Sequence, residues 1–149
     1  MHKQKIQVLL VEGHKVVRQG LCLMLASADD IEVAGTVSTA AEAWNRLQEI
    51  KVDVVLMNVG LPDKSGLGLL KQIRLSRPTQ AVLLFSMYAD EIYALRALML
   101  GASGYLTENS SVRTVTSAIR CVASGYSYLD ATLNSAGAEL SPSLVDGPA

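Results

Sequence analysis

The hydrophobic positions of the chain fall into short uncharged runs separated by longer segments with a helical repeat. The runs are rich in valine, isoleucine and leucine, which is typical of strands buried on both faces of a parallel sheet. They predict five strands, at Ile6–Val11, Ile31–Val37, Val54–Asn58, 80–85 and 104–106.

The segments between these strands place apolar residues three and four positions apart, which is the pattern of a helix with one buried face. Thr39 and Glu42 have the spacing of a capping box, Pro78 prevents a helix from continuing, and glycines end the last two helices. Five helices are predicted: the first follows residue 14, the second begins after Thr39, and the third runs over Gly66–Ser76. The fourth begins at Asp90, and the fifth runs over 111–124. Strict alternation of strands and helices predicts an α/β fold, with a parallel sheet covered by helices on both faces.

Composition limits the class of protein. The chain has 149 residues, of which 50% are hydrophobic and 18% charged, so it is globular, with one domain over residues 1–130. Residues 131–149 are rich in alanine, serine, glycine and proline and are predicted to be a linker or disordered tail. A net charge of −1 argues against direct nucleic-acid binding, and two cysteines are too few for a disulfide framework or metal site. Without a secretion signal or an apolar run that could span a bilayer, the protein is predicted to be cytoplasmic, with no membrane contact.

The third strand ends at a polar residue where chemistry is expected. In an open parallel sheet, functional side chains gather at the carboxyl ends of the strands. Asn58 occupies this position, and Gly60, Pro62 and Gly66 mark the loop that follows. An acid here would be a nucleophile, whereas an amide is not.

Several blocks of the sequence closely resemble the receiver domains of two-component response regulators. They are residues 8–14, 53–58 with Leu61, Pro62 and Gly66, then 86–87 and 101–106. His14 and residues 94–97 resemble the NarL/FixJ branch, which carries a C-terminal LuxR-type helix-turn-helix. The resemblance spans residues 6–129 and implies a CheY-like, flavodoxin-like fold with strand order 2-1-3-4-5.

The resemblance also implies a phosphorylation site, and this chain departs from it. Receivers accept a phosphoryl group on an aspartate, and hold Mg²⁺ with that aspartate and an acidic pair after the first strand. Here the acceptor position holds Asn58, the acidic pair is Glu12 and Gly13, and the position of a phosphoryl-binding lysine holds Glu108. The hydroxyl position, Ser86, and the aromatic switch position, Tyr105, keep the family's residue types.

These departures predict an atypical receiver that is not phosphorylated, binds Mg²⁺ weakly or not at all, and is not an enzyme. An amide is a poor nucleophile, Mg²⁺ prefers anionic oxygens, and Glu108 would repel a phosphoryl group. Two alternatives stay open: a phosphorylatable receiver that uses Glu12 or Ser86 as acceptor, and a stand-alone receiver that acts as a dimerisation or antagonist module. A flavin-type small-molecule binder would need a phosphate loop that residues 12–17 do not supply.

The predicted mode of action is protein–protein contact in signal transduction and transcription regulation. The contact surface is either the fourth helix, fifth strand and fifth helix, or the first and last helices. Residues on or next to the former are Asp90, Tyr93, Arg96, Met99 and Tyr105. A homodimer is expected, with a sensor kinase or another regulator as partner. DNA binding would need a C-terminal domain absent from this chain, although residues 139–142 resemble the opening of a LuxR-type helix-turn-helix.

Overall fold

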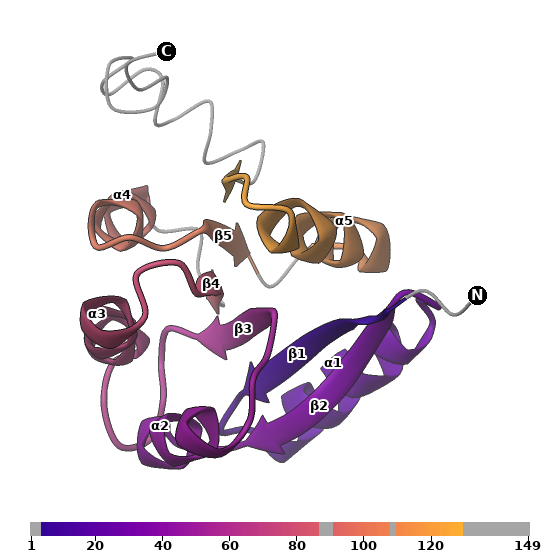
Figure 1. Cartoon of the computed structure of the whole chain (residues 1–149), viewed down its shortest axis with the longest axis horizontal. Helices are drawn as coiled ribbons and strands as arrows, with labels where there is room; N and C mark the ends of the chain where they lie inside the picture. Colours follow the sequence, from indigo (N-terminus) through magenta and orange to yellow (C-terminus); the bar gives the residue numbers. More distant parts are fainter. Residues whose placement is uncertain (1–3, 87–90, 108–109, 130–149) are drawn as a thin grey trace.

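The computed structural model describes residues 4–86, 91–107 and 110–129. Strands and helices alternate along the chain, as the hydrophobic pattern predicts (Figure 1). The elements are β1 (Ile6–Val11), α1 (Lys15–Ala26), β2 (Ile31–Val37), α2 (Ala40–Glu49), β3 (Val54–Asn58), α3 (Gly66–Ser76), β4 (Ala81–Ser86), α4 (Glu91–Met99), β5 (Gly104–Thr107), α5 (Val112–Ala123) and β6 (Tyr128–Leu129). Asp90, Glu108 and the predicted tail from residue 131 lie outside the described residues.

The strands form one parallel sheet in the order β2-β1-β3-β4-β5-β6. The predicted flavodoxin-like α/β fold and its order 2-1-3-4-5 are therefore confirmed. The sheet has one strand more than predicted, because Tyr128 and Leu129 pair with Gly104 and Tyr105. A strand of two residues is too short to carry a hydrophobic period, so its existence depends on the partner strand.

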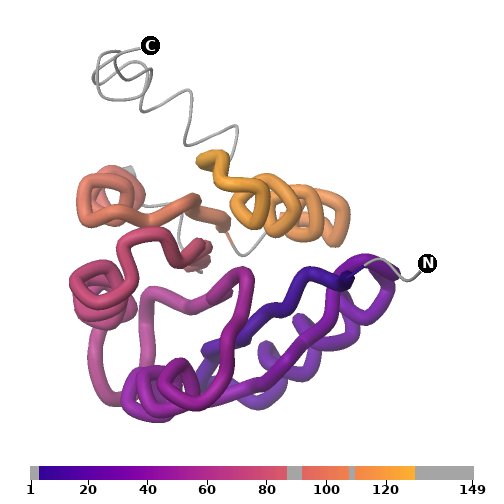
Figure 2. The backbone as a smooth tube through the Cα atoms, viewed as in Figure 1, coloured from indigo at the N-terminus to yellow at the C-terminus, as the bar shows by residue number. Residues whose placement is uncertain are grey.

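The helices lie on both faces of the sheet. In Figure 2, α2, α3 and α4 gather on one side, whereas α1 and α5, which are far apart in the sequence, lie on the other side. The Arg120 guanidinium of α5 donates two hydrogen bonds, of 2.7 and 3.0 Å, to the carboxylate of Asp30 in the turn before β2. No helix in the described part of the chain is both long and apolar enough to cross a lipid bilayer.

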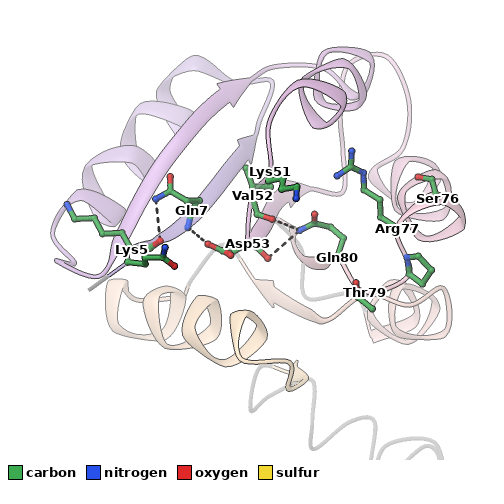
Figure 3. Close-up of a pocket in the computed structure, with 11 residues that line it drawn as sticks. Lys5, Gln7, Lys51, Val52, Asp53, Ser76, Arg77, Thr79 and Gln80 are labelled. Carbon is green, nitrogen blue, oxygen red and sulfur yellow. Dashed lines mark hydrogen bonds between the residues drawn. The ribbon is translucent and has the colours of Figure 1, made fainter. Parts of the chain in front are cut away.

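A polar groove of about 860 Å³ lies at the amino ends of the strands, and its side chains are largely used to hold the strands together (Figure 3). The Asp53 carboxylate accepts a hydrogen bond of 2.7 Å from the backbone of Gln7, and Gln80 Nε2 donates to the carbonyls of Val52 and Asp53. These contacts join β1, β3 and β4 at the sheet end opposite to Asn58. This groove is therefore a structural feature of the fold.

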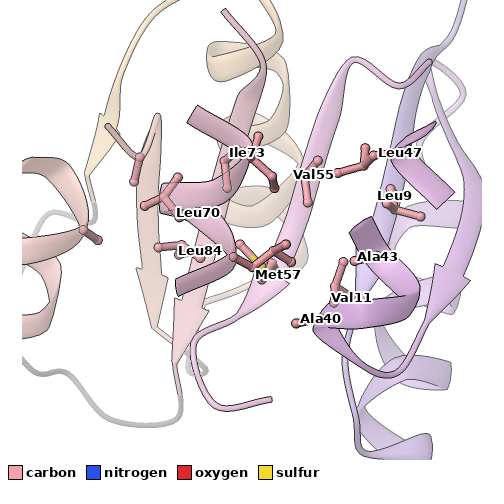
Figure 4. Packing of buried hydrophobic residues seen from close by; sticks show 14 of the residues in the cluster. Leu9, Val11, Ala40, Ala43, Leu47, Val55, Met57, Leu70, Ile73 and Leu84 are labelled. Carbon is pink, nitrogen blue, oxygen red and sulfur yellow. The ribbon is translucent and has the colours of Figure 1, made fainter. Parts of the chain in front are cut away.

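The core consists of two hydrophobic layers separated by the sheet. Side chains alternate along each strand, so Leu9 and Met57 face α2 and α3, whereas Leu10 and Leu56 face α1 and α5. Figure 4 shows the first layer, where Leu70 and Ile73 of α3 pack beside residues of β1, β3 and β4. All five residues of β3 are buried between the two layers. The core thus fixes Asn58 at the end of a central strand.

Candidate functional site

Three sequence-predicted residues lie at the carboxyl edge of the sheet. Glu12 directly follows β1, Asn58 ends β3 and Ser86 ends β4. Because β1, β3 and β4 are adjacent and parallel, their ends meet at one place. Glu12 is fully buried and Asn58 is 6% exposed, whereas Ser86 is half-buried.

A direct hydrogen bond joins Glu12 and Asn58. Asn58 Nδ2 donates to Glu12 Oε2 at 2.7 Å. The other side-chain atom of the amide is also engaged, since Asn58 Oδ1 accepts from the backbone N–H of Gly60 at 2.9 Å. An amide can donate and accept at once, which a carboxylate cannot, and this site uses both capacities.

Two further residues hold the Glu12 carboxylate and its backbone. Glu12 Oε1 accepts from the backbone N–H of His14 and lies 2.9 Å from His14 Nδ1. Arg18 of α1 donates to the Glu12 carbonyl at 2.7 Å. Neither residue is among the site residues predicted from the sequence. The sequence contains one local signal for the His14 contact. An acidic side chain commonly accepts a hydrogen bond from the backbone N–H two residues later in a turn, and His14 lies two residues after Glu12.

The loop after Asn58 is held closely against the site. Gly60 pairs with Ser65, and the backbone N–H of Gly66 donates to the Val59 carbonyl at 2.7 Å. A Cβ on Gly66 would lie 2.6 Å from the Asn58 carbonyl oxygen. Only glycine therefore permits this approach of α3 to the end of β3.

The same loop reaches α2 through Asp63. The Asp63 carboxylate accepts from the backbone N–H groups of Ala40 and Ala41 at 2.8 and 3.0 Å. These bonds, led by that from Ala40, lower the pKa of Asp63, since they stabilise its charged form. The loop is thereby joined to α2 as well as to the end of β3.

The resemblance predicts that Gly13 stands at the second acidic-pair position, and the loop leaves no room there for a side chain. A Cβ on Gly13 would lie 2.8 Å from Pro62 Cγ and 2.9 Å from Pro62 Cδ. The proline ring cannot rotate away as a flexible side chain could. An aspartate at residue 13 would require the loop to shift.

The donor set does not fit Mg²⁺. This ion needs several anionic or neutral oxygens in octahedral geometry, and both Glu12 oxygens already accept hydrogen bonds from protein groups. The partner of Oε2 is the Asn58 Nδ2–H group, and the partial positive charge of its hydrogen would repel a cation. In the described part of the chain, no three His, Cys, Asp or Glu side chains are grouped as metal ligands.

The comparisons with known proteins agree with this fold. The family model for the response regulator receiver domain matches residues 8–120. The chain belongs to the response regulator receiver family.

Curated relatives, together with a solved LuxR-family structure, support the NarL/FixJ, or LuxR-type, branch for this receiver domain. The chain is 34% identical over 124 residues to the response regulator GacA of Pseudomonas viridiflava, which covers 83% of this chain and 58% of GacA. It is 33% identical over 129 residues to the oxygen regulatory protein NreC of Staphylococcus haemolyticus, which covers 86% of this chain and 59% of NreC. The chain thus spans somewhat under three fifths of these relatives.

Solved structures of response regulators have the same fold as this chain. A LuxR-family two-component response regulator from Aurantimonas sp. SI85-9A1 superposes with a TM-score of 0.87 at 27% identity, over 92% of this chain and 98% of that one. The receiver domain of the putative regulator NarL from Mycobacterium tuberculosis has the same fold, with a TM-score of 0.79 at 24% identity, over 83% of this chain and 99% of that one.

The two positions that the resemblance predicts to keep the family's residue types, Ser86 and Tyr105, lie on adjacent strands. Ser86 pairs with Thr107 across β4 and β5, and Tyr105 lies two residues earlier on β5. Tyr105 is fully buried among the residues that face α3 and α4. The residue at the predicted aromatic switch position is therefore buried in this structure. Glu108 lies outside the described residues.

The predicted contact surface on α4 is partly apolar. Tyr93, Arg96 and Met99 are exposed, and Ile92, which the sequence analysis did not select, is 68% exposed beside them. Tyr105 lies beneath this surface rather than on it, because its ring packs into the core. Asp90 lies outside the described residues.

Proposed function

We propose that this receiver domain transmits signals without aspartyl phosphorylation, through protein–protein contacts. The observation that carries the proposal is the hydrogen bond from Asn58 Nδ2 to Glu12 Oε2 at 2.7 Å. The amide replaces the nucleophile, and the same amide occupies the carboxylate that would otherwise bind a metal ion. The acceptor site is thereby held together by its own side chains, without metal or phosphate.

The proposed setting is a cytoplasmic response regulator of the LuxR type that regulates transcription. In this setting the domain acts by binding, not by catalysis, and its partners are a second copy of itself and a sensor kinase or another regulator. DNA would be contacted only by a domain beyond this chain. A role as an antagonist that pairs with other receivers uses the same contacts.

The test is phosphorylation with a small donor. The purified chain is incubated with Mg²⁺ and acetyl phosphate, and its intact mass is recorded beside that of a phosphorylatable receiver treated identically. We expect no phosphoryl adduct on the natural chain and a stoichiometric adduct on the control receiver.

Variants identify any alternative acceptor. A stoichiometric adduct that disappears in Glu12→Gln or in Ser86→Ala contradicts the proposal and makes the domain an ordinary switch with a displaced acceptor. An Asn58→Asp, Gly13→Asp, Glu108→Lys variant tests whether the family's residues restore phosphorylation. Because the side chain introduced at residue 13 would meet Pro62, a second version with Pro62→Ala relieves that contact.

A further inference from the structure

A cavity of about 270 Å³ lies between α1 and α5 on one face of the sheet. Its walls come from α1 and α5, and its floor from the strands β3, β4 and β5. The lining includes Leu21, Met24, Leu56, Phe85, Leu106 and Val115. Leu56 and Leu106 are each 1% exposed and Phe85 is 8% exposed, so the floor is part of the core rather than of the outer surface.

Gly20 leaves space above this floor. It lies inside α1 and lines the cavity, and a Cβ built on it meets no atom within 4 Å. Glycine is unfavourable within a helix, and neither a turn nor a close packing partner requires it here. Gly20 is itself exposed, so a larger side chain at this position would fit the backbone and lie at the rim of the cavity.

The chemistry of the lining selects a type of ligand. None of the described residues around the cavity is charged, so a charged ligand would lose its hydration without gaining a counter-ion. Phe85 and Met24 provide an aromatic ring and a thioether, both of which favour contact with aromatic rings. A dry apolar cavity of roughly 150 Å³ can hold benzene, so this one has room for a larger ring system.

One polar group in the cavity lacks a partner. The Ser110 hydroxyl is buried, and among the described residues it has no hydrogen-bond partner. Buried hydroxyls in proteins are normally satisfied by protein or by ordered water, which a ligand can replace. A ligand with one hydroxyl or carbonyl group would satisfy it.

We propose that this cavity binds a neutral aromatic molecule of one or two rings, with one hydrogen-bonding group directed to Ser110. The site is independent of the phosphorylation proposal, since it uses other residues on the opposite side of the sheet from α3. It is nevertheless adjacent to the strand-end site, because Phe85 pairs with Asn58 in the register of β3 and β4. A bound ring would therefore contact the strands that carry Asn58 and Ser86.

The probe is 2-naphthol, followed by methyl NMR spectra of the whole chain. We expect saturable shifts in the methyl signals of Leu21, Leu56, Leu106 and Val115, with a stoichiometry of one. Naphthalene should bind the same site, and 2-naphthoate should bind at least about tenfold more weakly, because its charge has no partner there.

Variants separate the roles of space and polarity. Gly20→Leu should abolish binding by obstructing the rim of the cavity, whereas the matched control Gly20→Ala should retain it. Ser110→Ala should weaken 2-naphthol by about tenfold and leave naphthalene unchanged. Thermal unfolding of each variant verifies that it is folded.

Several outcomes would overturn the proposal. They are the absence of saturable shifts, shifts confined to α4, equal binding by Gly20→Leu and the natural chain, and shifts that follow protein concentration rather than probe. The last outcome would mean that a second copy of the chain covers the cavity.

Discussion

A single amide determines the electrostatics of the strand-end site. Asn58 donates to a fully buried carboxylate and accepts from the loop that follows it. With an aspartate at the same position, two carboxylates would lie within hydrogen-bond distance in a buried place. Like charges so close destabilise each other unless a cation or a proton lies between them.

Asn58→Asp should therefore destabilise the metal-free domain by about 2–3 kcal/mol at pH 7, because it converts a buried hydrogen bond into repulsion. The pair of carboxylates would have one raised pKa in the folded state. The folded state then binds a proton more readily than the unfolded one, so the loss should shrink as pH falls towards about 4. Urea unfolding at several pH values measures both effects.

The charge-swapped variant Asn58→Asp, Glu12→Gln is the matched control. It restores one donor and one carboxylate, so most of the stability should return. Equal instability of the single and double variants would show that shape, rather than charge, sets the cost.

The positions of these residues could be predicted from the sequence, but their contacts could not. Strand ends are visible in the hydrophobic pattern, and the strand order that the resemblance implies makes Glu12 and Asn58 neighbours at one edge of the sheet. The roles of His14 and Gly60 depend on backbone N–H directions. The exclusion of a side chain at Gly13 depends on where Pro62 lies. The spacing of residues in the sequence does not predict the N–H directions or the position of Pro62.

At the scale of elements, the loop between β3 and α3 is joined to α2 by Asp63. This side chain satisfies two N–H groups at the start of α2, in addition to the bond that Thr39 accepts from the Glu42 N–H at 3.1 Å. The predicted capping box is only partly formed, because the Glu42 carboxylate accepts from the Ser38 and Thr39 hydroxyls. A residue distant in sequence has taken over part of the capping, which a local motif cannot predict.

Asp63→Ala should cost about 1 kcal/mol at neutral pH, the usual cost of losing a capping side chain. The pKa of Asp63 is lowered in the folded state, so its contribution is complete above the unfolded pKa of about 4 and is lost as pH falls through the folded pKa. Natural chain and variant should thus converge in stability once the pH is below the lowered pKa of Asp63. Asp29→Ala, at an exposed acid, is the control; a similar loss there would contradict the capping role.

A second junction of elements depends on Arg74 of α3. Its guanidinium donates to the carbonyls of Gly101, Arg77, Pro78 and Gln80, at distances between 2.6 and 3.2 Å. Burial lowers the pKa of Arg74, although the group stays charged. One side chain thus joins the end of α3, the start of β4 and the loop before β5.

Arg74→Lys should destabilise the domain by about 2 kcal/mol, because one ammonium group cannot reach carbonyls spread around a planar fork. Arg96→Lys, on the exposed face of α4, should change stability by less than about 0.5 kcal/mol. Thermal unfolding of both variants compares them directly, and equal effects would mean that Arg74 is replaceable by any cation.

At the scale of the whole molecule, both helical layers present exposed apolar side chains, and two surfaces compete as the dimer contact. On α4, Ile92 and Met99 are 68% and 74% exposed, and on α1, Val16 and Leu23 are 81% and 77% exposed. Each pair is seven residues apart and so shares a helix face. The sequence predicted both surfaces without choosing, since exposure is not visible in a hydrophobic pattern.

The neighbours of these pairs favour α4. Tyr93 and Arg96 accompany Ile92 and Met99, and tyrosine and arginine are enriched at the energetic centres of interfaces. The α1 pair has Gln19 and Gly20 between its members; glutamine is not among the residue types enriched at interface centres, and glycine has no side chain. We therefore expect self-association through α4.

Ile92→Ser with Met99→Ser should weaken dimerisation by at least about tenfold, since each copy would bury less apolar surface. The matched pair Val16→Ser with Leu23→Ser should leave the dissociation constant unchanged. Sedimentation equilibrium over a range of concentrations measures both. If only the α1 pair matters, the contact lies on the face with α5, and a dimer would then restrict access to the cavity beside Gly20.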